Sequence, residues 1–329
     1  MLLVFAWETG LLYDKISGMT PEIARDMARR PMRTDFVSEV TSYDEATRIV
    51  SFRMEPDPRR YSTFEKDGET YYLDKYLRYA FSLKDMLAGG WDGMPCYTLS
   101  PRIESTPDYA QARQSALSGE IETGKYTPPV ENPREHSELD LGESEHQLGF
   151  LSVDICGATA LRKRNRAGFD RAYELFTREL GTVVGQFNGS ILKTKGDGFI
   201  AYIDHPSFTR LCDNIVDMGL SFLVVLHQSL NPVLEKAGFE LLNIRIGADY
   251  GEAVVKKFSI PATGFTVQEV ASDALNRAVK IEEACEPNEF WIGRCLYELI
   301  HVQWLERATE TSFDGTCVGM PDYKTYRVR

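Results

Sequence analysis

Leu148-Gly-Phe-Leu-Ser-Val-Asp154-Ile-Cys-Gly157 is an apolar run that ends in an acid and then a glycine. Farther along, Ile191-Leu-Lys-Thr-Lys-Gly-Asp197-Gly-Phe-Ile-Ala201 places Lys-Gly-Asp-Gly between two β-favouring runs, which predicts a hairpin tip. Two strands that pair side by side would bring Asp154 and Asp197 together. Two carboxylates beside open glycine backbone are the hard oxygen ligands that Mg²⁺ with a triphosphate requires. We therefore expect the chain to be organised around this pair.

The composition limits the classes of function. The chain has 329 residues and a formal net charge of −12, so its surface repels phosphate backbones and anionic lipid, and we expect it to bind neither nucleic acid nor a membrane. The six cysteines form no Cys-x-x-Cys pair, and the five histidines form no ligand-spaced cluster with them, which argues against zinc. Scattered cysteines, and the absence of any apolar run of about 18 residues, favour a cytoplasmic protein.

Three regions differ in pattern. Residues 1–125 are mixed and predict a small α+β accessory region of unknown role, with a hairpin signal at Asp67-Gly68. Residues 126–147 carry three prolines, many acids and few apolar side chains, which predicts an extended linker. From residue 148 to residue 329 the apolar periodicity is strong and alternates between strand and helix spacing. We expect the catalytic domain in this last region.

The periodicity of residues 148–329 predicts the order of the elements. We expect a strand at 148–154, a helix at about 159–187, a hairpin at 189–203, a helix from Pro206 to about Leu230, strands at about 241–248 and 251–257 joined at Asp249-Tyr250-Gly251, a helix at 270–285, a strand at 289–292, a short helix at 293–300 and closing strands near 302–306 and 322–328. The leading β-α-β-β-α-β order predicts an α+β, ferredoxin-like fold, with an antiparallel-centred sheet and helices on one face.

Four segments of this region resemble motifs of the class III nucleotidyl cyclases, in the order in which that family has them. These segments are Phe150–Thr159, similar to the first metal motif; Leu192–Gly198, similar to the base-lysine and second metal motif; Asn243–Gly251, similar to the strands that carry a phosphate-binding arginine; and Ser272–Lys280, similar to the transition-state segment. The resemblance implies that the region is a class III cyclase catalytic domain.

The resemblance also implies the roles of particular residues. Asp154 and Asp197, with the backbone carbonyl of Ile155, would bind two divalent ions, Mg²⁺ or Mn²⁺. Arg245 would hold phosphate and Asn276 would orient the ribose while its 3′-oxygen attacks the α-phosphorus. The products would be a 3′,5′-cyclic nucleotide and pyrophosphate.

The family's geometry implies a homodimer with two shared active sites. One chain would contribute the metal aspartates, and the other would contribute Lys193 and the segment 269–280. A monomer should then be inactive.

Two positions depart from the family. Lys280 stands where the family has its transition-state arginine, so a point charge replaces a planar fork, and Arg277 lies on a different helix face. Lys193 argues against guanine, and Glu269 occupies the base-partner position where adenylate cyclases have a short Asp or Thr. The extra methylene of Glu269 suits a smaller pyrimidine, and the short chain resembles the bacterial pyrimidine cyclases of anti-phage signalling.

These residues predict a cyclase that converts UTP to cyclic UMP, and three alternatives stay open. The first alternative is a cytidylate cyclase, and the second is an adenylate cyclase that makes cyclic AMP. The third is a degenerate cyclase-homology domain that binds nucleotide without turnover, and Lys280 favours this third alternative. Each residue also has a structural explanation by itself. Asp154 is suited to capping a helix, Asp197 to a turn, and Arg245 to an exposed cross-strand pair.

Overall fold

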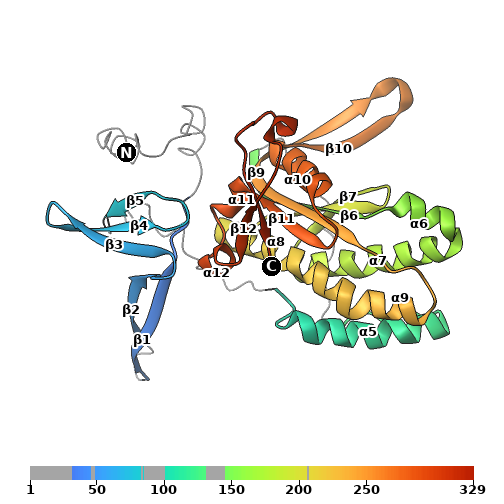
Figure 1. The fold of residues 1–329 in the computed structure, drawn as a ribbon, viewed down its shortest axis with the longest axis horizontal. Helices are drawn as coiled ribbons and strands as arrows, with labels where there is room; N and C mark the ends of the chain where they lie inside the picture. Colours follow the sequence, from blue (N-terminus) through green and yellow to red (C-terminus); the bar gives the residue numbers. More distant parts are fainter. Residues whose placement is uncertain (1–31, 46–48, 83, 85–100, 131–144, 206) are drawn as a thin grey trace. The chain divides into compact units, whose positions relative to one another are not determined.

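The chain divides into two compact units between Pro95 and Cys96 in the computed structural model (Figure 1). The structure describes residues 32–45, 49–82, 84, 101–130, 145–205 and 207–329. The division lies before the boundary predicted at residue 125, because helix α5 (Thr106–Thr123) packs on helices of the second unit. Residues 131–144 of the predicted linker lie outside the described residues, and strand β6 begins at Glu145, before the predicted end of the linker.

The first unit contains a two-stranded and a three-stranded antiparallel sheet. The strands are β1 (Phe36–Asp44), β2 (Ile49–Pro56), β3 (Tyr61–Lys66), β4 (Glu69–Asp74) and β5 (Ala80–Ser82). The predicted hairpin is confirmed as β3–β4, and Asp67 and Gly68 at its turn have φ of 55° and 78°. Arg60 is fully buried and donates to Asp35 at 2.8 Å and to Asp74 at 2.7 Å, so an ion-pair network joins the strands.

The second unit is built on one large sheet with strand order β12-β13-β11-β9-β6-β8-β7. The bounds are β6 (Glu145–Ile155), β7 (Ser190–Lys195), β8 (Gly198–Ile203), β9 (Ile244–Ile260), β10 (Phe265–Ala271), β11 (Glu289–Gly293), β12 (Ala308–Thr311) and β13 (Thr325–Val328). Strands β9, β6, β8 and β7 pair antiparallel, and β6 and β8 are the two inner strands of these four. This is the predicted ferredoxin-like, antiparallel-centred α+β arrangement, extended by β11, β13 and β12.

Helices cover both faces of this sheet, whereas the sequence predicted helices on one face (Figure 1). The bounds are α6 (Ala158–Arg164), α7 (Arg166–Gln186), α8 (Phe208–Val225), a π-helical turn (Leu226–Leu230), α9 (Asn231–Lys236), α10 (Asp273–Ala284), α11 (Arg294–Tyr297) and α12 (Val302–Leu305). A Cβ at Gly149 would meet α8 side chains, whereas a Cβ at Gly247 would meet the α10 backbone. Helix α10 therefore lies on the face opposite α8. Its apolar side packs on Leu148 and Phe150 of that face.

Three details of the predicted element order are wrong. Residues 249–251 form no turn, because Asp249 is buried in an ion pair with Arg277 and β9 runs straight through this point. The following strand β10 instead pairs with the outer half of β9 as an extended hairpin. Residues 302–305 form the short helix α12, and the strand follows it as β12.

Helix α5 is fixed to α7 by buried charge. Arg113 donates to Glu179 at 2.7 and 3.0 Å and to the carbonyl of Thr127 at 2.8 Å. The Arg178 guanidinium lies 4.6 Å from the ring centroid of Tyr126. The first residues of the predicted linker therefore contact the second unit at Tyr126 and Thr127, while Val130 is exposed to solvent.

Two glycines test how closely α10 and β9 pack. A Cβ at Gly247 would lie 2.2 Å from the Glu282 backbone nitrogen and 2.4 Å from the Ala278 oxygen, so Gly247→Ala must separate the helix from the strand. We expect it to lower the free energy of unfolding by about 2 kcal/mol or more in chemical denaturation. Gly119→Ala is the matched control on α5, where a Cβ meets nothing within 4 Å and removes backbone freedom from the unfolded chain. It should stabilise the protein by about 0.5–1 kcal/mol. Equal effects of the two changes would contradict this packing.

Candidate active site

The two aspartates meet at one end of the central strands. Asp154 lies near the end of β6, directly opposite Gly198 on β8 and Arg245 on β9. Asp197 lies in the β7–β8 turn, and its carbonyl accepts a hydrogen bond from the Ile155 backbone nitrogen at 3.3 Å. A Cβ at Gly198 would lie 1.9 Å from the Val153 oxygen, so only glycine allows this approach of β8 to β6. The predicted juxtaposition of the two carboxylates is thus present.

The proximity of these carboxylates changes the acidity of Asp197. Burial, a hydrogen bond to Asp154 and the charge of Asp154 together raise the pKa of Asp197 to about 6. Two carboxylates that share one proton repel each other once that proton leaves, so a cation that replaces the proton stabilises the site. A divalent metal ion would relieve this repulsion between the carboxylates of Asp154 and Asp197.

The Arg245 guanidinium lies beside the carboxylate of Asp154. It donates to the Asp154 carboxylate at 3.0 Å and to the Glu283 carbonyl at 3.2 Å. Its Nε is buried without a hydrogen-bond partner and lies 3.6 Å from Glu282 Oε1, which is also buried without one. The guanidinium is therefore held at the acidic pair and keeps an unsatisfied donor, which fits a group that exchanges its carboxylate for an incoming phosphate.

Glu282 completes a buried network that the sequence reasoning missed. This residue of α10 is fully buried, and it accepts hydrogen bonds from the Ser152 hydroxyl at 3.2 Å and from the Lys195 ammonium. Its position directly after Ile281, on the buried side of the amphipathic helix, was the available signal. Lys195 was visible in the Lys-Thr-Lys-Gly-Asp stretch, yet only the fold shows that it reaches Glu282 of α10 from the end of β7.

The predicted catalytic residues Asn276 and Lys280 are not part of this cluster. Both lie on the outer side of α10, where Asn276 is exposed and Lys280 pairs with Glu283 at 2.8 Å. Arg277 lies on the inner side, buried against Asp249, so it is fixed in the core and cannot replace the missing arginine. The structure joins neither Asn276 nor Lys280 to the acidic pair within one chain.

The predicted base-contacting residues are also separate. Lys193 is exposed on strand β7, next to the β-bulge between Ile191 and Lys193. Glu269 is exposed on β10, directly opposite Lys256 of β9. No interaction between Lys193 and Glu269 is present in the described part of the chain, so their base-selecting role stays a prediction.

The donor set at the acidic pair fits a hard divalent ion. Within the described residues, no three His, Cys, Asp or Glu side chains lie together as a metal cluster. Mg²⁺ is nevertheless commonly held by one or two carboxylates, while water and substrate phosphates fill its remaining positions. The two carboxylates and the Ile155 carbonyl match this requirement. With the raised pKa of Asp197, this chemistry supports Asp154, Asp197 and Ile155 as the residues that would hold it.

Comparison with known proteins identifies the fold. No protein-family profile matches this sequence, and no curated protein is similar enough to count as a relative. The structure resembles that of the guanylyl cyclase Cya2, with 18% identity and a TM-score of 0.50 over 57% of this chain and 93% of that chain. It also resembles the adenylyl cyclase CyaB from P. aeruginosa, with 20% identity and a TM-score of 0.50 over 57% of this chain and 96% of that one.

The second unit therefore has the fold of a class III cyclase catalytic domain, as the sequence predicted. Among the helices that the structure describes, none combines the length and apolar composition needed to cross a bilayer.

Metal binding should depend on the ionisation of Asp197. We expect the affinity for Mn²⁺ to rise as the pH increases through about 6, because the shared proton must leave before the ion binds. Isothermal titration calorimetry across about pH 5 to 8 measures this change. In Asp197→Asn the ionised pair is absent, so at neutral pH the metal-free variant should melt at a higher temperature than the wild type, with no further rise from Mn²⁺. A Mn²⁺-induced rise equal to that of the wild type would contradict the assignment.

Proposed function

We propose that the protein is a metal-dependent nucleotidyl cyclase that converts a nucleoside triphosphate to a 3′,5′-cyclic nucleotide and pyrophosphate. The observation that carries this proposal is the convergence of Asp154, Asp197 and Arg245 at one end of the central strands of a cyclase-type fold. Catalysis of this kind depends on positioning and charge neutralisation and needs no covalent nucleophile.

Each residue of the cluster has a role in this chemistry. Asp154 and Asp197, with the Ile155 carbonyl, would hold two divalent ions, which supply charge neutralisation at the triphosphate and acidify the 3′-hydroxyl of the ribose. Arg245 would leave Asp154 and bind phosphate, because its guanidinium already lies beside the acidic pair. Glu282 would limit how far Arg245 moves, because its carboxylate lies 3.6 Å from the Arg245 Nε.

The proposed substrate is UTP and the product cyclic UMP, a second messenger suited to anti-phage signalling. Lys193 and Glu269 support a pyrimidine, because a lysine disfavours guanine and the longer acidic side chain reduces the room for a purine. Both side chains are exposed and therefore available to a base. CTP and ATP are the competing substrates, and the fold does not choose between bases, because the similar structures are named as a guanylyl and an adenylyl cyclase.

A homodimer with two shared sites is part of the proposal. Asn276 and Lys280 point outward from α10, where a second chain can be reached, whereas the acidic pair of the same chain lies on the inner side. The β9–β10 hairpin adds an exposed apolar surface made of Phe258, Ile260, Phe265 and Val267. An exposed apolar group of this kind is typical of a protein–protein contact.

The second candidate is a nucleotide-binding domain without turnover. The Lys280–Glu283 ion pair favours this second candidate, because Glu283 binds the ammonium group that would otherwise stabilise the transition state. The pair is exposed, so it contributes little free energy and a bound triphosphate would readily displace it.

Incubation with each of the four triphosphates and Mn²⁺ tests the activity directly. We expect pyrophosphate and a cyclic product, with UTP giving the highest kcat/KM. Asp154→Ala should reduce turnover by at least about 10³-fold, because the metal site loses a ligand, while the fold stays intact by circular dichroism. Lys236→Ala, a charge change at the exposed end of α9, is the control and should keep wild-type turnover. No product from any triphosphate would overturn the enzyme proposal in favour of the binding domain.

Mixing two inactive variants tests the shared sites. Asp154→Ala and Asn276→Ala should each be inactive alone, because each removes one half of every site. Their mixture should recover about a quarter of wild-type turnover, since half of the dimers are mixed and each has one intact site. Recovery is measured as cyclic product after the variants exchange subunits. An inactive mixture that contains mixed dimers by mass spectrometry would show that each site is built within one chain.

A further inference from the structure

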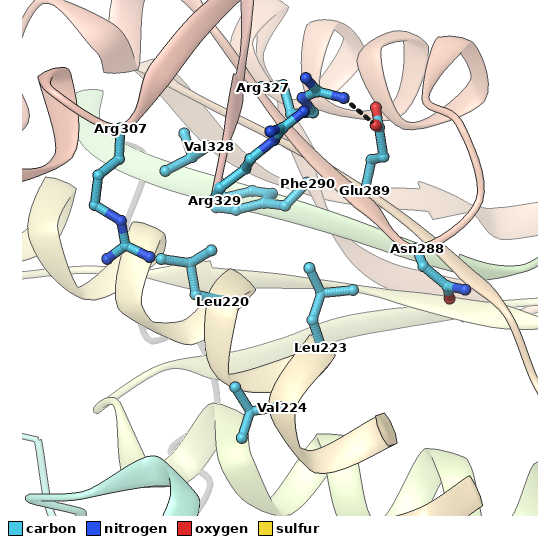
Figure 2. Close-up of a pocket in the computed structure, with 10 residues that line it drawn as sticks. All are labelled: Leu220, Leu223, Val224, Asn288, Glu289, Phe290, Arg307, Arg327, Val328 and Arg329. Atoms are coloured by element: carbon cyan, nitrogen blue, oxygen red, sulfur yellow. Dashed lines mark hydrogen bonds and ion pairs between the residues drawn. The ribbon is translucent and has the colours of Figure 1, made fainter. Parts of the chain in front are cut away.

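A pocket lies in the second unit, and neither Asp154 nor Asp197 lines it. It has a volume of about 380 Å³ and lies between α8 and the C-terminal strands. Its aliphatic side chains, Leu220, Leu223 and Val224, come from α8, and its arginines come from the C-terminal segment across from that helix (Figure 2). Nothing in the proposed cyclase chemistry uses this pocket.

The floor and one wall of the pocket are apolar. Phe290 and Val328 are buried beneath it, and the Phe290 ring packs so closely on Gly219 that a Cβ there would lie 2.6 Å from it. Leu220 and Leu223 remain only partly covered, although they lie on a helix inside a folded unit. A pocket lined in this way favours a ligand with an apolar body of limited size.

The rim of the pocket is cationic, although the chain as a whole has a net charge of −12. Arg307, Arg327 and Arg329 line it, with Glu289 as the only acid among the ten lining residues. Glu289 accepts from Arg327 at 2.5 Å, and Arg329 adds to the positive charge that lowers its pKa. One acid therefore faces three guanidiniums, which leaves an excess of positive charge over an apolar floor.

Two further observations show that the positive charges and donors of these arginines are not fully paired within the chain. The Nε of Arg327 is buried and has no hydrogen-bond partner among the described residues. Arg307 lies over the ring of Trp304 at 5.1 Å, and the acid whose charge it feels is Asp217 on α8. Burial and the neighbouring Asp213 raise the pKa of Asp217 to about 7, so Asp217 neutralises Arg307 only in part.

Asn288 connects this pocket to the acidic pair. It lines the pocket at the turn between α10 and β11, in a left-handed conformation with φ of 61°. Its side chain donates to Asn243 at 2.7 Å and accepts from the Ile244 nitrogen at 3.2 Å. The Asn243 carbonyl in turn accepts from the nitrogen of Cys156 at 2.8 Å. Asn288 is thus one contact away from the two backbone segments that carry Asp154 and Arg245.

We propose that this pocket is an effector site for a small organic anion with an apolar body, of the class of medium-chain carboxylates, and that Asn288 couples its occupancy to the acidic pair. The carboxylate would accept hydrogen bonds from Arg307 while the chain covers Leu220 and Leu223. Occupancy would order the α10–β11 turn and thereby the start of β9. The inference goes beyond the proposed cyclase activity and does not depend on the base.

Calorimetry with sodium octanoate tests the binding step on the full chain. Octanol has the same apolar body without charge, and acetate has the charge without the body, so octanoate should bind at least about ten-fold more tightly than either. Arg307→Gln and Leu223→Gln should each weaken octanoate about five-fold or more. The controls Lys236→Gln and Leu241→Gln change an exposed cation and an exposed leucine elsewhere, and should stay within about two-fold. Octanoate binding that is no tighter than octanol and acetate, or that Arg307→Gln leaves unchanged, would overturn the proposal.

The coupling is read from Mn²⁺ affinity without any nucleotide. Saturating octanoate should tighten Mn²⁺ binding by about three-fold or more in the wild type. Asn288→Gly keeps the left-handed backbone and removes the side-chain bonds, so it should bind octanoate but lose this effect. No octanoate effect in the wild type, or an equal effect in Asn288→Gly, would overturn the coupling. A chain without cyclase activity would still pass both tests, so failure of the proposed function is distinguishable from failure of this site.

Discussion

Two carboxylates that strand pairing holds close together are the constraint on which the site depends. Asp154 is fixed by β6, which has neighbours on both sides, and Asp197 by a turn that only glycine at position 198 allows to approach β6. Their repulsion appears in the pKa of Asp197, raised to about 6 by burial and by Asp154. The folded chain tolerates this strain because the rest of the sheet, anchored by α8 on one face and α10 on the other, leaves the strands no alternative register.

The buried acid Glu282 helps to fix the positions of the cations around the acidic pair. Glu282 is carried into the site by α10 and fixed there by Ser152 and Lys195. It is the buried acid that the Arg245 guanidinium faces beside Asp154. The close contact of α10 with β9 at Gly247 sets the depth of Glu282, so packing and electrostatics are not separable here. A shift of the helix would displace Glu282 and, with it, the counter-charge of the Arg245 guanidinium.

Much of this arrangement could be predicted from the sequence, because local pattern determines it. The apolar run before Asp154 and the Lys-Gly-Asp-Gly turn predicted the paired strands, and Asn276 and Lys280 were correctly assigned to a helix. The second helical face and the continuous β9 could not be predicted, because they follow from contacts between segments distant in sequence. Asp249 shows the limit clearly, since an acid beside Tyr-Gly favours a turn until Arg277 is brought against it.

Anomalous diffraction from crystals grown with Mn²⁺ and a non-reactive UTP analogue tests directly whether the acidic pair is a divalent-metal site beside a triphosphate. We expect manganese peaks about 2 Å from carboxylate oxygens of both Asp154 and Asp197, with Arg245 moved from Asp154 to a phosphate. Manganese bound elsewhere, or an analogue bound while Arg245 still pairs with Asp154 and no metal is present, would contradict it.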